Sequence, residues 1–143
     1  MATMILLGLL GAVIAAIVGT FWYSGATPMG KWHMQYLGFD KLSPEEMKQK
    51  IAEVKPKMPL SYATQLLLSF ITSLFIVFVA SRTGSMVYGY VAVIWLAFIV
   101  PNIGSSLLWS NCDRALVWKK FFSDSLSNLV TYLLIAWVVL LII

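Results

Sequence analysis

The chain has 143 residues, of which 60% are hydrophobic and only 11% are charged, and its formal net charge is +4. Soluble domains carry about 25% charged residues, so this chain lacks the polar surface that water requires. Its single cysteine, Cys112, excludes an internal disulfide, and together with the single histidine, His33, it excludes a zinc site made of several such ligands. We therefore expect an integral membrane protein.

Charged residues divide the chain into four apolar segments. No charged side chain occurs in residues 1–30, 58–81, 83–112 or 125–143. A helix needs about 20 apolar residues to cross the hydrocarbon of a bilayer, and each segment supplies roughly that length. The sequence predicts an all-α, polytopic fold with one membrane domain over residues 1–143. Its transmembrane helices are expected near 4–24, 60–81, 86–110 and 120–142.

The distribution of Lys and Arg predicts the orientation. The loop at 25–59 contains six lysines, and the stretch before the fourth helix adds Arg114, Lys119 and Lys120. The opposite side of the membrane would carry only Arg82. Because basic loops stay in the cytoplasm, we expect both large loops inside and both termini outside, in the cell (inner) membrane.

A short amphipathic helix is predicted at 44–55 within the first loop. Ser43 is a good N-cap, Pro44 suits the first helical position, and Glu46 completes a capping box. The apolar residues Met47 and Ile51 then fall on one face, with lysines available to the other. The pattern suits a helix lying on the inner membrane surface, or equally a solvated hairpin packed on its own bundle.

Aromatic residues flank the predicted spans. Thr27-Pro28 indicates a further helical turn in the first loop, which would place Trp32 and Tyr36 one turn apart. Trp22 and Tyr23 stand at the end of the first predicted span. Such amphipathic rings favour the headgroup level, so these four residues are expected to be interfacial anchors.

The first helix carries rows of small residues, among them Gly8, Gly11, Ala15 and Gly19. In lipid, small residues four apart let two helix backbones approach closely. The rows predict either packing against the chain's own helices, which we favour, or a face through which the protein self-associates. The pattern indicates a close contact without naming the partner.

Polar residues on the other three helices would share one layer in the cytoplasmic half of the membrane. This candidate polar layer contains Gln65, Ser69, Asn102, Ser105, Asp124 and Asn128. The side chains either satisfy one another and fix the helix arrangement, or line a hydrated vestibule in which Asp124 attracts or relays cations. Asp124 also lies close enough to Lys119 and Lys120 to form an interfacial ion pair.

The sequence argues against several functional classes. It has no phosphate-binding glycine loop, no paired carboxylates within the membrane, and no set of nucleophile and base. It also lacks a basic, aromatic-interleaved stretch that would bind nucleic acid. We expect no enzymatic activity, no cofactor and no metal, and we expect Cys112 to be inert.

Three short motifs carry a family resemblance. Phe21-Trp22-Tyr23-Ser24, followed by Met29-Gly30-Lys31-Trp32 and Tyr36-Leu37-Gly38, resembles the opening signature of a group of small, mainly bacterial membrane proteins. That family is known as domain of unknown function 1761, and the resemblance covers nearly the whole chain. It implies four hydrophobic helices and a polar first loop, and it assigns no activity.

Function is expected to depend on packing. We expect a non-catalytic structural or accessory helix bundle, in a homo-oligomer or a larger membrane complex, with the lipid bilayer and other membrane subunits as partners. The alternative is a small oligomeric channel or carrier that uses the polar layer, and a membrane enzyme is a distant third.

Overall fold

The computed structural model describes residues 1–143 and is helical throughout, without strands. This confirms the all-α prediction. The structure has three helical stretches that are long and apolar enough to cross a membrane: Ala2–Trp22, Pro44–Leu108 and Arg114–Ile142. The main helices are α1 (Ala2–Trp22), α2 (Pro28–Tyr36), α3 (Pro44–Val54), α4 (Met58–Thr83), α5 (Val87–Ile94), α6 (Val100–Leu108) and α7 (Arg114–Ile142).

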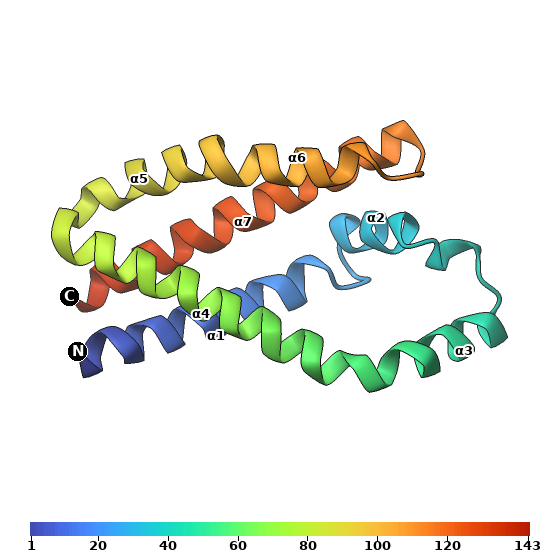
Figure 1. Ribbon diagram of the computed structural model, residues 1–143, viewed down its shortest axis with the longest axis horizontal. Helices are drawn as coiled ribbons and strands as arrows, with labels where there is room; N and C mark the ends of the chain where they lie inside the picture. The colour runs from blue at the N-terminus through green and yellow to red at the C-terminus, as the bar shows by residue number, and fades with distance from the viewer.

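The long stretch Pro44–Leu108 reverses direction at Gly84. This glycine ends α4 with φ of 54°, a left-handed conformation that residues with a side chain rarely adopt. A single 3₁₀ turn, Gly84–Met86, then leads into α5. After α3, the stretch therefore forms two antiparallel arms, α4 and α5–α6, which meet near the two chain termini (Figure 1).

The arm α5–α6 contains an irregular turn. The segment Trp95–Ile99 is a π-helix, which joins α5 to α6. Pro101 follows it, and proline has no N–H to donate to a carbonyl of the preceding turn, so the regular α-helical ladder cannot continue through this point. The indole N–H of Trp95 donates to the backbone carbonyl of Ser125, 2.7 Å away, and ties this irregular turn to α7.

Local capping explains where the loop helices and α7 begin. Ser43 and Glu46 form the predicted capping box of α3, since each side chain accepts a hydrogen bond from the other's backbone N–H. Helix α7 begins at Arg114, six residues before the predicted span, because the Asp113 carboxylate accepts the N–H groups of Ala115 and Leu116. Hydrophobicity predicts where a span starts, whereas the cap decides where the helix starts.

The hydrophobic core lies at the end of the molecule that holds both termini and the Gly84 turn (Figure 1). Only 20 of 143 residues are buried, and many large apolar side chains are exposed, among them Phe98 at 68%. This distribution suits a helical protein whose outer surface meets lipid rather than water. The core residues are Leu7, Ile76, Val77, Ala80, Val87, Val91, Ile135, Ala136 and Val139.

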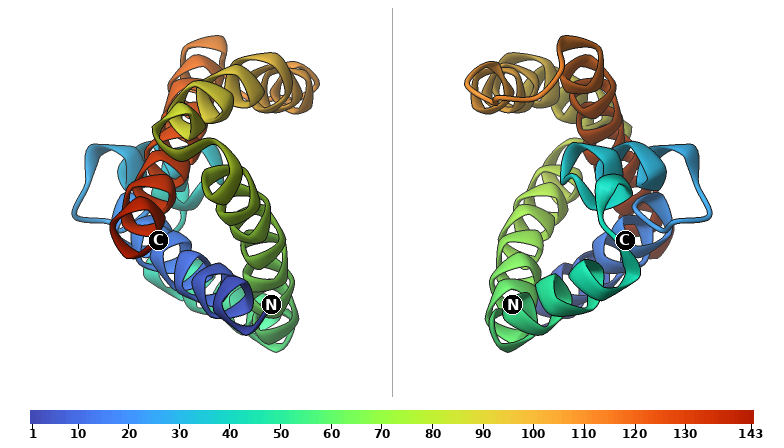
Figure 2. Two further views of the ribbon diagram at one scale, coloured as in Figure 1. Left: turned by 90° about the vertical axis from the view of Figure 1, so that its left-hand side faces the viewer. Right: turned by 90° about the vertical axis from the view of Figure 1, so that its right-hand side faces the viewer.

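The helices diverge toward the opposite end, which carries α2, α3 and the loop before α7. Seen end on, α4 and α5–α6 lie to the same side of α7, with α5–α6 at the top of the view, and α1 crosses below them from α7 to α4 (Figure 2). Helix α3 packs against no other long helix, and residues 51–60 are exposed throughout. Its position on a membrane surface stays a prediction. The structure thus has a packed end and an open end.

Two of the predicted small residues allow α1 to approach α4 closely. A Cβ added at Gly8 would lie 2.6 Å from the Leu74 side chain, and one added at Gly11 would lie 2.6 Å from the Ser73 hydroxyl oxygen. Ser73 is fully buried and cannot move aside. A Cβ at Gly19 would meet nothing within 4 Å. The structure therefore places Gly8 and Gly11 in contacts within the chain, whereas Gly19 lies beside open space.

We expect Gly11→Ala to destabilise the protein by about 1–3 kcal/mol, the usual cost of overpacking a core contact. Gly19→Ala is the matched control, because it makes the same change in the same helix at a position with free space. Thermal unfolding in detergent should show a lower apparent Tm for Gly11→Ala and an unchanged or higher one for Gly19→Ala. Equal melting temperatures would contradict the α1–α4 contact.

Candidate functional site

A tight turn follows α1 and leads the chain into α2. The Thr27 hydroxyl donates to the carbonyls of Trp22 and Ser24, at 2.6 and 3.1 Å, and accepts the backbone N–H of Gly30 at 2.9 Å. Gly30 has no room for a side chain, because a Cβ would lie 1.8 Å from the Ser24 carbonyl oxygen. The turn therefore depends on a hydroxyl at position 27 and on glycine at position 30.

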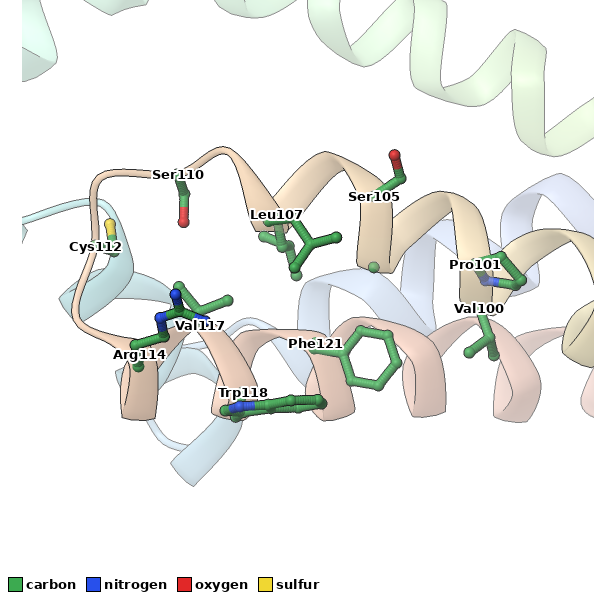
Figure 3. A pocket seen from close by; sticks show the side chains of 12 residues that line it. Val100, Pro101, Ser105, Leu107, Ser110, Cys112, Arg114, Val117, Trp118 and Phe121 are labelled. Carbon is green, nitrogen blue, oxygen red and sulfur yellow. The ribbon is translucent and has the colours of Figure 1, made fainter.

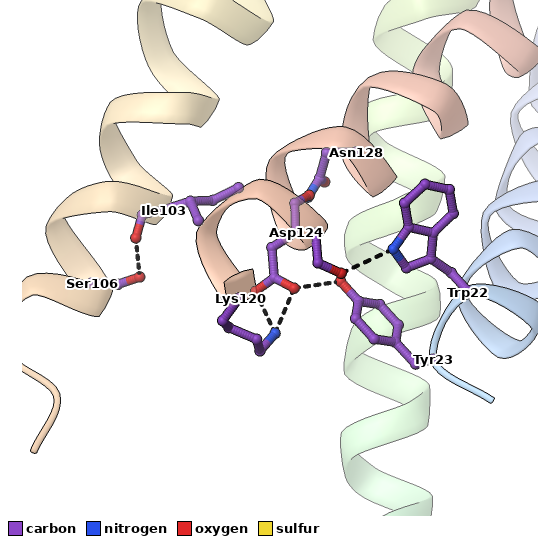
Figure 4. Close-up of polar contacts among 8 residues, drawn as sticks. Trp22, Tyr23, Ile103, Ser106, Lys120, Asp124 and Asn128 are labelled. Carbon is purple, nitrogen blue, oxygen red and sulfur yellow. Dashed lines mark hydrogen bonds and ion pairs between the residues drawn. The ribbon is translucent and has the colours of Figure 1, made fainter. Parts of the chain in front are cut away.

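This turn presents two aromatic side chains to α7. The indole N–H of Trp22 donates to the Ser123 hydroxyl at 3.1 Å, and the Tyr23 hydroxyl donates to the Asp124 carboxylate at 2.7 Å (Figure 4). Lys120, one turn earlier on α7, forms an ion pair with the same carboxylate. Trp22 and Tyr23, predicted as interfacial anchors, thus hold the end of α1 against α7.

Trp22, Tyr23, Lys120, Ser123 and Asp124 form a polar cluster. The lysine of this cluster is enclosed. Lys120 is only 8% exposed, and its ammonium lies 5.2 Å from the ring centroid of Tyr23 and 5.8 Å from that of Tyr36. Aromatic faces attract cations at such distances, and the Asp124 carboxylate supplies the compensating charge. The cluster is therefore neutral as a whole, which argues against a free carboxylate that attracts cations.

His33 of α2 completes the cluster. Its ring lies 4.9 Å from the ring of Tyr23, and its Nδ1 is buried without a hydrogen-bond partner. Burial lowers the pKa of His33 below the usual 6.5, and the nearby Lys120 ammonium lowers it further, while the Asp124 carboxylate opposes both effects. The lowered pKa favours the neutral form of His33.

The polar cluster borders a cavity of about 1000 Å³ between α1, α4 and α7. The cavity extends from the polar cluster to the hydrophobic core, since Ile135 of the core also lines it. Polar groups supply a large part of its lining, so it suits water or a polar molecule better than a packed apolar side chain. Its polar lining residues are Thr20, Tyr23, His33, Tyr62, Gln65, Ser69, Thr72, Asp124, Ser127, Asn128, Thr131 and Tyr132.

The structure brings together four of the six residues of the predicted polar layer. Gln65 and Ser69 face the cavity from α4, and Asp124 and Asn128 face it from α7. Ser105 lines a different cavity, between α6 and α7, and Asn102 is exposed and lines neither of them. Of the small-residue row, Ala15 and Gly19 also border the larger cavity.

Trp32 and Tyr36, the other two predicted anchors, also approach the start of α7. The Lys119 ammonium lies 5.9 Å from the Trp32 ring, and the Cys112 thiol lies 3.7 Å from the backbone carbonyl of Tyr36. The sequence offered no local signal for Ser123 or His33 as members of the cluster, because their partners lie 101 and 10 positions away. Lys120 and Asp124 were predictable, since side chains four apart on a helix meet.

The polar groups of the cluster are paired with one another. No group of three His, Cys, Asp or Glu side chains is placed to hold a metal ion. Lys120 and Asp124 form an ion pair with each other, and the hydroxyl of Tyr23 donates a hydrogen bond to Asp124. The arrangement can fix helices to one another and can hold neutral polar groups or water in the adjoining cavity.

Removing the charge of Asp124 should destabilise the protein, because Lys120 would remain enclosed without its partner. Asp124→Asn is expected to cost between about 1 kcal/mol, as for exposed pairs, and about 3–5 kcal/mol, as for buried pairs. A combined Lys120→Met and Asp124→Leu variant removes both charges and should recover much of the loss. The measurement is the apparent Tm in detergent. A double variant with a lower apparent Tm than Asp124→Asn would contradict this role of the ion pair.

Stability should fall on acidification from pH 7.5 to 5.5 through His33. The pKa of His33 is lower in the folded protein than the usual 6.5, so on acidification the unfolded chain binds a proton before the folded protein does. The free energy of unfolding is therefore highest above pH 6.5 and decreases as the pH falls below that value. The groups that face it are Tyr23, Lys120 and Asp124. His33→Gln should flatten the dependence of apparent Tm on pH in this window. An equally steep dependence in His33→Gln would assign the effect to another group.

The comparisons with known proteins give a family and nothing more specific. A family model described as "Protein of unknown function (DUF1761)" matches residues 7–140. Neither the search of curated proteins nor the search of solved structures finds a match to the chain.

Proposed function

The chain belongs to the DUF1761 family of proteins of unknown function, and from this premise we propose that it is a non-catalytic membrane component that works by assembling with further copies or with other membrane subunits. It would span the membrane four times, through α1, α4, the arm α5–α6 and α7. The proposal is supported by the reversal at Gly84, which gives the long helical stretch two antiparallel arms (Figure 1).

The orientation follows from the charges. In this topology Arg82, in the last turn of α4, is near the packed end with both termini. The lysines of the first loop are at the open end, together with Arg114, Lys119 and Lys120 in the first turns of α7. The open end would face the cytoplasm, as the distribution of basic residues favours. Helix α3, exposed and followed by lysines, would then lie at the cytoplasmic surface.

Unpartnered carboxamides are the observation that carries the assembly role. Three carboxamides lie on the long apolar helices: Gln65, Asn102 and Asn128. Asn128 is satisfied within the chain, since it donates to the Asp124 carbonyl at 2.8 Å and accepts from the Tyr132 hydroxyl at 3.1 Å. Gln65 and Asn102 form no side-chain hydrogen bond, and both are exposed.

A carboxamide without a hydrogen-bond partner is energetically unfavourable inside the hydrocarbon of a membrane. Asn102 lies six residues before the end of α6, roughly 9 Å along the helix, and so within the hydrocarbon in the proposed topology. A carboxamide without a partner costs about 1–3 kcal/mol in proteins. Hydroxyl groups avoid this cost by bonding to their own helix, as Thr64, Thr72 and Ser106 do. Asn102 forms no such bond and borders neither of the two cavities, so a second polypeptide would supply its partner.

Substitution of Asn102 tests the assembly role. Asn102→Leu should weaken association by about 3-fold or more, from the roughly 0.6–1.7 kcal/mol of an interhelical hydrogen bond in a membrane. Asn128→Leu is the matched control, since it removes the same group from a position satisfied within the chain. The assembly state is measured by native mass spectrometry after gentle extraction. It is also measured in liposomes, as the ratio of protein to lipid is lowered. Unchanged association in Asn102→Leu would reject the role of this residue.

A transport role is the second candidate, and the cavity of about 1000 Å³ favours it. Gln65 has no partner in the chain but borders this cavity, so water or a polar solute would satisfy it there. Flux measured in the same liposomes separates the two functions. Gln65→Leu should reduce flux of a small polar solute if the cavity is a path. No flux in the unmodified protein would leave assembly as the function.

A further inference from the structure

A second cavity lies between α6 and the first turns of α7, at the open end of the molecule (Figure 3). Its volume is about 460 Å³, within the range of small-molecule sites. Apolar side chains from both helices form most of its walls, and Gly104 widens it because no side chain projects there. The apolar residues that line it are Val100, Pro101, Leu107, Leu108, Val117, Trp118 and Phe121.

Two polar groups stand together at one end of this cavity. Ser110 has a buried hydroxyl oxygen without a hydrogen-bond partner, and Figure 3 shows it pointing into the gap between the helices, on the side of Arg114. Arg114 is the only charged residue of the lining, and its guanidinium forms no ion pair. The neighbouring Asp113 carboxylate is occupied by the backbone N–H groups that it caps.

The cavity thus combines a cationic, hydrogen-bonding end with an apolar interior. Eight residues separate Val100 from Leu108, the last residue of α6, so the apolar part extends roughly 12 Å along α6. The exposed indoles of Trp109 and Trp118 stand at the same end as Arg114, and such rings favour the headgroup level of a bilayer. A ligand that fits has an anionic head and a hydrocarbon chain.

We propose that this cavity is a binding site for an anionic glycerophospholipid. The lipid phosphate would bind the Arg114 guanidinium and accept the orphaned Ser110 hydroxyl, while one acyl chain enters the apolar cavity toward Val100. A guanidinium matches a phosphate by paired hydrogen bonds, which a zwitterionic lipid offers less favourably because its own ammonium competes. The proposal rests on the membrane location of the chain and is independent of its assembly role.

Cys112 provides a native reporter for this site. It is the only cysteine, it is partly exposed, and it lines the same cavity. We would place the full-length protein in nanodiscs of phosphatidylcholine, add phosphatidylglycerol, and measure the alkylation rate of Cys112 by the uncharged reagent N-ethylmaleimide. Native mass spectrometry of the released protein would count the retained lipid.

Phosphatidylglycerol should slow alkylation of Cys112 at least 5-fold and remain bound to the released protein. Arg114→Gln should reduce retained phosphatidylglycerol about 10-fold and abolish the protection. Gly104→Leu should do the same by filling the apolar part, since a Cβ there already lies 3.4 Å from the Phe121 ring. Arg82→Gln and Gly89→Leu are the matched controls outside the cavity, and both should behave as the unmodified protein.

Three results would overturn the proposal. The first is equal retention of phosphatidylglycerol by Arg114→Gln and the unmodified protein, and the second is an equal loss in Arg82→Gln, which would indicate a general charge effect. The third is equal protection by oleate, which would assign the site to a free fatty acid. Failure to enter nanodiscs would instead reject the membrane topology, and a monomer that still retains phosphatidylglycerol would reject only the assembly role.

Discussion

The hydrogen bond from Tyr23 to the Asp124–Lys120 ion pair is the contact on which the open end of the molecule depends. The hydrophobic core holds the helices together only near the termini, and from there the helices diverge. Without a second attachment, α1 and α7 would be free to separate further at their other ends. Trp22 and Tyr23 supply that attachment through two side-chain hydrogen bonds to consecutive residues of α7. The cavity between α1, α4 and α7 adjoins this attachment, since Tyr23 and Asp124 both line it.

The same contact explains the local sequence around it. Tyr23 and Trp22 reach α7 only because the chain turns sharply after them, and that turn needs the Thr27 hydroxyl and the absence of a side chain at Gly30. These residues fall in the segment that resembles the family signature. Their physical roles are therefore to shape a turn and to attach it to a neighbouring helix, and neither role requires a reaction to be catalysed at this site.

Much of the fold was predictable because long, uncharged and apolar segments favour helices. Uncharged stretches of about 20 residues predicted the helices, and Ser43 and Glu46 predicted the start of α3 from local hydrogen bonding. The contacts between helices were harder. The sequence put Asn102 and Gln65 in one layer by depth alone, whereas the structure places Gln65 at the cavity and Asn102 outside it. Depth follows from residue number, but the direction of a side chain depends on how each helix is rotated.

That rotation has an identifiable origin in the arm α5–α6. A π-helical turn accommodates one more residue than an α-helical turn, so the segment Trp95–Ile99 rotates everything after it by roughly 100° about the helix axis. Deletion of a single residue from this segment would restore regular winding and turn a different side of α6 toward α7. The surface that α6 offers to its surroundings is therefore set by the winding of five backbone residues, and its polar residues could change sides without any change in their own identity.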